Sequence, residues 1–233
     1  QGKKYLDGNA SIWTNLHGHN HPKLNQAIER QLKHVAHTSA LGLANEPASL
    51  LAEKLVKAAG LPLRKIFYSD DGSTALEVAL KMAYEFARRS GRSNSPRFLS
   101  LDGAYHGDTF GAMAVGERNL FSAPFEDKLF PVARVPWPST WWNDDDVDRK
   151  ETAALQILED TLQTPTAAVI IEPLLQGAGG MTMVRPEFLR EVESRTKAAG
   201  ALLIADEVLT GFGRCGDWFA CRRAGIRPDL MAL

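Results

Sequence analysis

The chain has 233 residues, with 27 Lys and Arg against 28 Asp and Glu, and a formal net charge of −1. Nucleic-acid-binding and membrane-surface proteins usually carry a basic excess, so this balance argues against both classes. No apolar run approaches the roughly 18–20 residues of a transmembrane span, and the two cysteines, Cys215 and Cys221, cannot form a disulfide framework.

Helix-like stretches alternate with short apolar runs, a pattern that predicts an α/β fold with a mostly parallel sheet flanked by helices. The apolar spacing predicts helices over 23–35, 46–59, 74–89 and 187–199. Strands are expected over 65–69, 97–101, 167–171, 201–205 and 228–233. The unbroken runs at 167–171 and 201–205 are typical of central strands covered on both faces. The segment 131–150, with its prolines, tryptophans and acidic run, is expected to be an irregular surface excursion.

The turn that follows 65–69 is the first candidate for a binding site, because ligands of open parallel sheets bind at the carboxyl ends of the strands. It includes Gly72 and Ser73, just before the expected helix. Such a turn offers free N–H groups, a hydroxyl and the positive end of the helix dipole to a phosphate. The same residues also fit an ordinary capping box with Thr74 and Glu77, and the sequence leaves both interpretations open.

The turn that follows 97–101 presents Tyr105, His106 and Asp108, and its two glycines allow a sharp reversal of the chain. A flat aromatic ring beside a histidine could stack on a planar ligand. A plain turn with a partly buried tyrosine fits the pattern equally well.

The expected strands 167–171 and 201–205 are also followed directly by polar residues. After 167–171 come Glu172 and a glycine-rich loop that lacks both the dinucleotide and the Walker A patterns. After 201–205 comes Asp206, whose burial would be costly without a partner. That partner is either a cationic group such as a protonated ring nitrogen of a ligand, or a structural salt bridge, for example to Arg214.

The three histidines His17, His19 and His21 suggest a metal site, but their alternate spacing matches no usual structural zinc site. An ordinary turn bounded by glycine and proline is therefore the preferred interpretation of this segment, and no bound metal is expected. Neither cysteine has a CxxC spacing or an activating neighbour, so a nucleophilic thiol is not expected.

Taken together, these motifs resemble the class III pyridoxal-phosphate-dependent aminotransferases, which have the fold of type I pyridoxal-phosphate enzymes. The resemblance covers essentially the whole chain and rests on LDG at 6–8, HGHNHP at 17–22, DGSTALE at 71–77, YHG at 105–107, EP at 172–173 and ADEV at 205–208. It implies that 13–233 form the large cofactor-binding domain, incomplete at its C-terminal end, and that 1–12 are the remnant of an N-terminal or small-domain segment. The chain stops inside an expected strand, so we expect a fragment.

The resemblance also assigns roles to individual residues. Gly72 and Ser73 would bind the phosphate of pyridoxal 5'-phosphate, and Tyr105, with His106 beside it, would stack on the pyridine ring. Asp206 would pair with the protonated ring nitrogen, and Val208 would pack on the other ring face. Tyr105 and Asp206 would therefore be the catalytic residues within this chain.

Two further residues, Asp108 and Trp13, match the family's substrate pocket. The sequence departs from the family at Ile12, where many members have a second tryptophan. The Schiff-base lysine of the family is expected just beyond Leu233.

Within the class, the runs Tyr105–Pro131 and Gln176–Met181 resemble the branch that makes 7,8-diaminopelargonate from 7-keto-8-aminopelargonate in biotin biosynthesis. The partners implied are a small-molecule amino donor, S-adenosylmethionine in most relatives, and the keto-acid acceptor. A cytoplasmic homodimer that binds neither nucleic acid nor membrane is expected. The 233 residues alone are expected to be inactive for lack of the lysine.

Three alternatives remain from the sequence. One is another class III aminotransferase that acts on ω-amino acids or diamines, which Ile12 leaves open. The second is a non-catalytic cofactor-binding protein. The third is a metal-binding module built on the three histidines.

Overall fold

The computed structural model describes residues 2–60 and 62–233, which divide into two compact units, Gln1–Lys54 and Leu55–Leu233. The first unit contains α1 (Ala10–Trp13), α2 (Pro22–Leu32) and the first part of α3 (Glu46–Ala59). Neither α1 nor α2 has a buried residue. Trp13, a predicted substrate residue, belongs to this unit.

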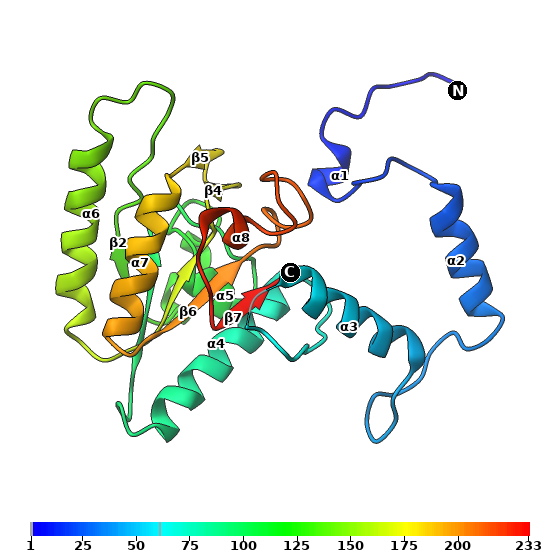
Figure 1. Cartoon of the computed structure of the whole chain (residues 1–233), viewed down its shortest axis with the longest axis horizontal. Helices are drawn as coiled ribbons and strands as arrows, with labels where there is room; N and C mark the ends of the chain where they lie inside the picture. Colours follow the sequence, from blue (N-terminus) through cyan, green and yellow to red (C-terminus); the bar gives the residue numbers. More distant parts are fainter. Residues whose placement is uncertain (1, 61) are drawn as a thin grey trace. The chain divides into compact units, whose positions relative to one another are not determined.

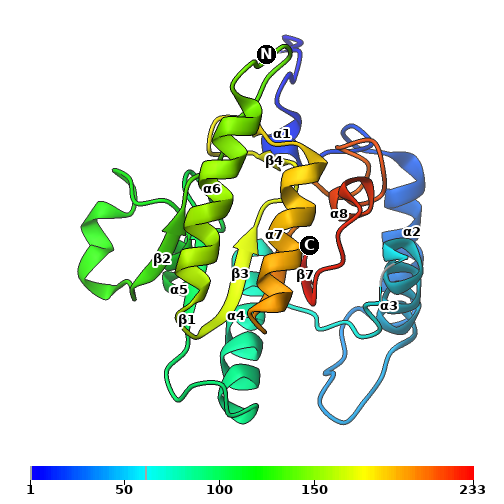
Figure 2. The same cartoon turned by 60° about the vertical axis from the view of Figure 1, so that its left-hand side comes forward.

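The second unit is a five-stranded parallel sheet with helices on both faces, which confirms the predicted α/β fold (Figures 1 and 2). The strands of the sheet, in the spatial order β2-β1-β3-β6-β7, are β1 (Arg97–Leu101), β2 (Val132–Val135), β3 (Thr166–Ile171), β6 (Leu202–Asp206) and β7 (Leu230–Ala232). The helices are α4 (Gly72–Arg89), α5 (Phe110–Val115), α6 (Val147–Leu162), α7 (Pro186–Ala198) and α8 (Ala220–Ala224), with a 3-10 turn at Ala123–Lys128 and the small hairpin β4 (Leu175–Gln176) and β5 (Thr182–Met183).

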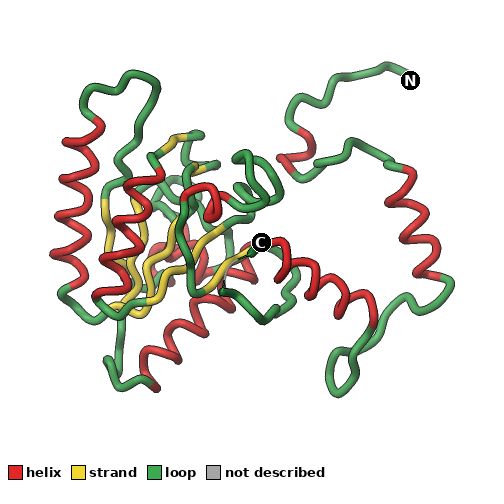
Figure 3. Tube along the Cα trace, in the orientation of Figure 1, coloured by secondary structure: helices red, strands yellow, loops and turns green. Residues whose placement is uncertain are grey.

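Alternate residues of the central strands enter two separate hydrophobic cores. Val169 and Leu203 face α6, α7 and α8, whereas Ile170 and Ile204 face α4 and α5. All six residues of β3 are buried, as expected for a strand covered on both sides. Figure 3 shows the strands as the middle layer, with helices on either side and loops at the strand ends.

The order of the strands reverses beside β1. The chain passes from β1 outward to β2, then returns to place β3 on the other side of β1 and continues through β6 to β7. Loops that leave β1 and β3 therefore diverge, and this switch point is where open α/β sheets bind ligands.

Two sequence expectations about elements were wrong. No strand forms over 65–69, and the side chains of Phe67 and Tyr68 are 63% and 48% exposed, so their apolar character does not serve a buried sheet face. The segment 131–150 is less irregular than expected, because it contains β2 and the start of α6.

Candidate functional site

The N-terminus of α4 combines a capping box with free backbone donors. The Asp71 carboxylate accepts the N–H of Thr74 at 2.8 Å, and the Thr74 hydroxyl accepts the N–H of Asp71 at 3.0 Å. Within residues 2–60 and 62–233, the N–H groups of Gly72 and Ser73 have no acceptor. The two interpretations of this turn are thus compatible, because a capped helix still offers two N–H groups and its dipole to an anion.

The loop after β1 is held against this helix end. The Asp108 N–H donates to Ser73 Oγ at 3.1 Å. Gly107, at φ +121°, makes the approach possible, since a Cβ there would lie 2.0 Å from Ser73 Oγ. The ring of Tyr105 is 45% exposed and its hydroxyl donates to Asp108 Oδ2 at 2.9 Å. Partial burial, together with this hydrogen bond to a carboxylate, raises the pKa of Tyr105 to about 12, so its hydroxyl stays protonated at neutral pH.

Asp206 at the end of β6 is buried and paired with a histidine. His106 Nδ1 lies 2.7 Å from Asp206 Oδ2, and the N–H of Val208 donates to Asp206 Oδ1 at 3.1 Å. Arg214, the partner suggested from the sequence, donates its Nε–H to the backbone oxygen of Leu209 at 2.7 Å. His106 therefore compensates the cost of burying the carboxylate.

Val208 lies beside the N-terminus of α4. A Cβ on Gly72 would lie 2.9 Å and 3.0 Å from the two Val208 methyl groups, so glycine is what allows this contact. The Val208 side chain is 49% exposed. A part-exposed aliphatic face and the part-exposed ring of Tyr105 thus accompany the free N–H groups and the buried Asp206.

Glu172, directly after β3, is a site residue for which the sequence pattern indicated no specific role. Its Oε1 accepts the N–H of Tyr105 at 3.1 Å, and its Oε2 accepts the N–H of Gly177 at 2.9 Å. Burial raises the pKa of Glu172, and the nearby His106 opposes that shift. The carboxylate therefore links the loop after β1 to the chain after β3, across the switch point between these two strands. The signal that could have found it is the one used for Asp206, a carboxylate directly after a buried apolar strand.

The structure therefore brings together seven of the eight predicted site residues in one unit: Gly72, Ser73, Tyr105, His106, Asp108, Asp206 and Val208. The eighth, Trp13, lies in the first unit. The set offers an anion site, flat and aliphatic faces and a buried carboxylate, which are the groups that a planar cofactor with a phosphate needs.

The described part of the chain places no three His, Cys, Asp or Glu side chains where they could hold a metal ion. Instead, His19 Nε2 lies 2.8 Å from Asp7 Oδ2. Among the described helices, none is both long and apolar enough to cross a membrane.

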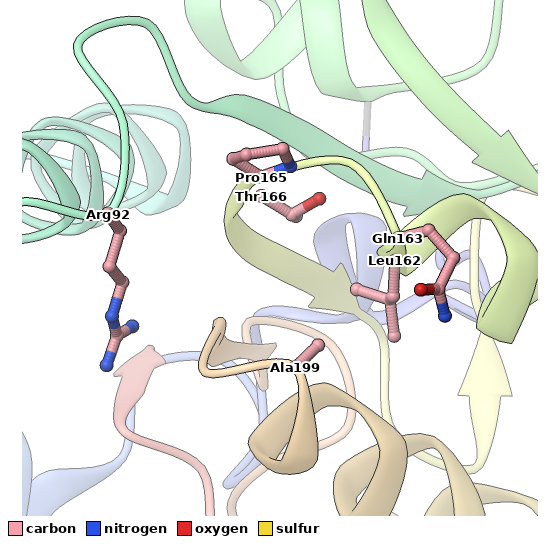
Figure 4. A pocket seen from close by; sticks show the side chains of 6 residues that line it. All are labelled: Arg92, Leu162, Gln163, Pro165, Thr166 and Ala199. Carbon is pink, nitrogen blue, oxygen red and sulfur yellow. The ribbon is translucent and has the colours of Figure 1, made fainter.

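A separate pocket lies at the amino end of the central strand β3, whereas the site residues follow the carboxyl ends of the strands (Figure 4). It is lined by Arg92, Leu162, Gln163, Pro165, Thr166 and Ala199. The lining has no acid or histidine, so it offers no general acid or base near neutral pH.

Comparison with known proteins gives the same family from sequence and from structure. The family described as aminotransferase class III matches residues 1–233. The chain is 54% identical over 233 residues to an adenosylmethionine-8-amino-7-oxononanoate aminotransferase from Synechococcus elongatus, covering 100% of this chain and 55% of that protein. It is similar to the crystal structure of a protein of the same name from Methanocaldococcus jannaschii, with a TM-score of 0.86, 34% identity and coverage of 99% and 52%.

A PLP-bound amine transaminase from an uncultivated Pseudomonas species is also similar, with a TM-score of 0.89, 33% identity and coverage of 97% and 53%. The chain spans about half the length of the curated relatives that it matches.

Proposed function

Because the chain belongs to the class III aminotransferases, which depend on pyridoxal phosphate, we propose that it is the cofactor-binding part of the enzyme that converts 7-keto-8-aminopelargonate to 7,8-diaminopelargonate in biotin biosynthesis. The observation that carries the substrate assignment is the 54% identity, over all 233 residues, to a relative named for this reaction. That name also supports S-adenosylmethionine as the amino donor. The proposal includes a cytoplasmic homodimer, as is usual in the family.

The residues at the carboxyl ends of the strands fit the cofactor. The free N–H groups of Gly72 and Ser73 would hold its phosphate, as helix N-termini do for anions. The ring would lie between Tyr105 and Val208. When bound, pyridoxal phosphate supplies an electron sink that stabilises negative charge on the substrate carbon.

Asp206 would face the ring nitrogen and keep it protonated. A carboxylate close to a protonated nitrogen favours the charged form of that nitrogen. His106 Nδ1 and the N–H of Val208 hold one carboxylate oxygen each, so the orientation of Asp206 is set before the cofactor arrives. Burial excludes water that would weaken this ion pair.

Asp108 would contact the substrate from the same side as the Tyr105 ring. Its Oδ2 accepts the Tyr105 hydroxyl, and its backbone is fixed to Ser73, so the carboxylate has a defined position at the site. Trp13 would contribute the aromatic part of the substrate pocket. No lysine is among the residues that the structure brings to the site. Residues 1–233 alone would therefore bind the cofactor without a covalent bond and would not transaminate.

The full-length protein tests the proposal directly. Purified enzyme is incubated with 7-keto-8-aminopelargonate and either S-adenosylmethionine, lysine or alanine, and 7,8-diaminopelargonate is quantified by mass spectrometry. We expect product with S-adenosylmethionine, and loss of at least a hundredfold in kcat/KM in Asp206→Ala. Product with lysine alone would overturn the donor. No product with any donor, together with turnover of ω-amino acids, would overturn the substrate class.

A further inference from the structure

One face of α4 holds the backbone of the segment that follows Tyr105. Ser73 and Glu77 are four residues apart and therefore lie on the same face of the helix, one turn from each other. Ser73 Oγ accepts the N–H of Asp108 at 3.1 Å. Glu77 Oε1 accepts the N–H of Gly111 at 2.6 Å and the N–H of Ala112 at 3.2 Å. Two side chains of α4 thus bind three backbone donors within residues 108–112, which include the start of α5.

Two glycines, also four residues apart, allow this contact. A Cβ on Gly107 would lie 2.0 Å from Ser73 Oγ, and a Cβ on Gly111 would lie 2.3 Å from Glu77 Oε2. Both distances are far below any that a real side chain could adopt. A Cβ at Gly107 would also lie 2.9 Å from the Cα of Ser73, so the loop would have to move away from the helix, whereas a Cβ at Gly111 would displace the Glu77 carboxylate from its position. Ser73 and Glu77 therefore each face a glycine.

Glu77 has no cationic partner among the described side chains, and its charge is met by N–H groups at the start of α5. The opposite end of α5 is held by Arg134 of β2, which donates to the backbone oxygens of Ala114, Val115 and Gly116. A negative group at the start of a helix and a positive group at its end both complement the helix dipole. The short α5 is thus fixed at each end by a charged side chain from a neighbouring element.

Building on the proposed function, we propose that Glu77 is a positioning residue that sets the distance between the phosphate-binding turn and the loop carrying Tyr105 and Asp108. The phosphate site is the first turn of α4, and Glu77 is one turn further along the same rigid helix. Any displacement of α5 moves the Tyr105 ring relative to Gly72 and Ser73. Glu77 therefore controls whether one ligand can reach both the helix end and the ring.

The test compares four variants of the full-length holoenzyme. Glu77→Leu removes the acceptor, and Gly111→Ala disturbs the same contact from the other side. Glu77→Gln keeps one carbonyl oxygen, which can accept both N–H groups, because both bonds now go to Oε1 alone. Glu85→Ala is the matched control, since Glu85 lies on the same helix but pairs with Arg89 at 2.7 Å on the exposed surface.

Four quantities are measured: the Kd for pyridoxal phosphate after its removal, the visible circular dichroism of the bound cofactor, and kcat and KM for the keto-acid acceptor. We expect Glu77→Leu and Gly111→Ala to weaken cofactor binding about tenfold, which is the size of one lost hydrogen bond to a charged group. Both should also change the circular dichroism band, because the ring meets Tyr105 at a different angle. Glu77→Gln should restore both quantities to within about threefold of wild type.

The inference is overturned if Glu77→Leu lowers thermal stability but leaves the dichroism band and the Kd unchanged, because the contact would then be structural only. It is also overturned if Glu77→Gln is as impaired as Glu77→Leu in the two measurements. These failures differ from failure of the proposed function, in which the wild-type protein itself would show no visible band with pyridoxal phosphate.

Discussion

Glu207 is a fully buried carboxylate whose removal should destabilise the protein strongly. Its Oε2 accepts the Thr210 hydroxyl at 2.7 Å and the N–H of Ala220 at 2.9 Å, and its Oε1 accepts the N–H of Cys221 at 2.7 Å. The last two donors belong to the first turn of α8, so Glu207 caps that helix from the loop that follows β6. Its side chain is 0% exposed.

The hydrogen bonds set the size of the effect. Glu207→Ala leaves three buried donors without an acceptor, at about 1–3 kcal/mol each, so we expect a loss of about 3–9 kcal/mol in the free energy of unfolding. That is a large part of the roughly 5–15 kcal/mol of a typical domain. Glu207→Gln keeps the acceptor for two of the donors but turns an NH2 group toward the third, and should cost about 1–3 kcal/mol. Thr210→Val removes only the hydroxyl donor and should cost about 1 kcal/mol.

Urea unfolding followed by circular dichroism gives the free energies, and amide hydrogen exchange at residues 220 and 221 reports the cap itself. We expect the loss in the free energy of unfolding to be largest in Glu207→Ala, smaller in Glu207→Gln and smallest in Thr210→Val. Exchange at both amides should be accelerated most in Glu207→Ala. A loss below about 1 kcal/mol in Glu207→Ala would refute the reasoning, because three buried donors cannot lose their acceptor at so small a cost unless water replaces it.

The remaining predictions concern the site. Gly107→Ala should weaken pyridoxal phosphate binding by at least about tenfold, because the new Cβ would lie 2.0 Å from Ser73 Oγ. Gly213→Ala is the control, since φ at Gly213 is +94° with nothing within 4 Å of a Cβ; equal losses of affinity in the two variants would contradict the prediction. For Glu172, burial raises the pKa, so its contribution to stability is present below its unfolded pKa near 4.5 and is lost as the pH rises through the folded value. The stability of wild type relative to Glu172→Gln should therefore fall as the pH is raised from below 4.5 in urea titrations, and a constant difference would argue against a raised pKa.

The central sheet could be predicted from the sequence because its strands are buried on both faces and have unbroken apolar runs. Strand β1 and helix α3 have the expected bounds, β3 begins one residue earlier than expected, and β6 is shifted by one residue at both ends. Strand β2 was missed because it is a short edge strand that contains Arg134, whose guanidinium binds carbonyls of α5. That interaction depends on a tertiary contact which periodicity does not reveal.

The grouping of the seven site residues in the second unit was predicted for a similar reason, since they follow a strand or start a helix at the carboxyl ends of the strands. The partners of these residues were not predicted. His106 and Asp206 are 100 residues apart in the sequence, and Tyr105 and Glu172 are 67 apart. Strand ends indicate which side chains share an edge, but the pairing among them is decided by register and by side-chain packing.

The position of β3 also has a consequence for the order in which the chain can fold. Strand β1 is synthesised more than sixty residues before β3, and until β3 inserts, the edge of β1 that later pairs with it stays open. An open, apolar strand edge readily pairs with other chains. Insertion of β3 therefore closes the exposed edge, and it also carries Glu172 to the loop that bears Tyr105, so the step that protects the nascent sheet from aggregation is the one that begins to assemble the site.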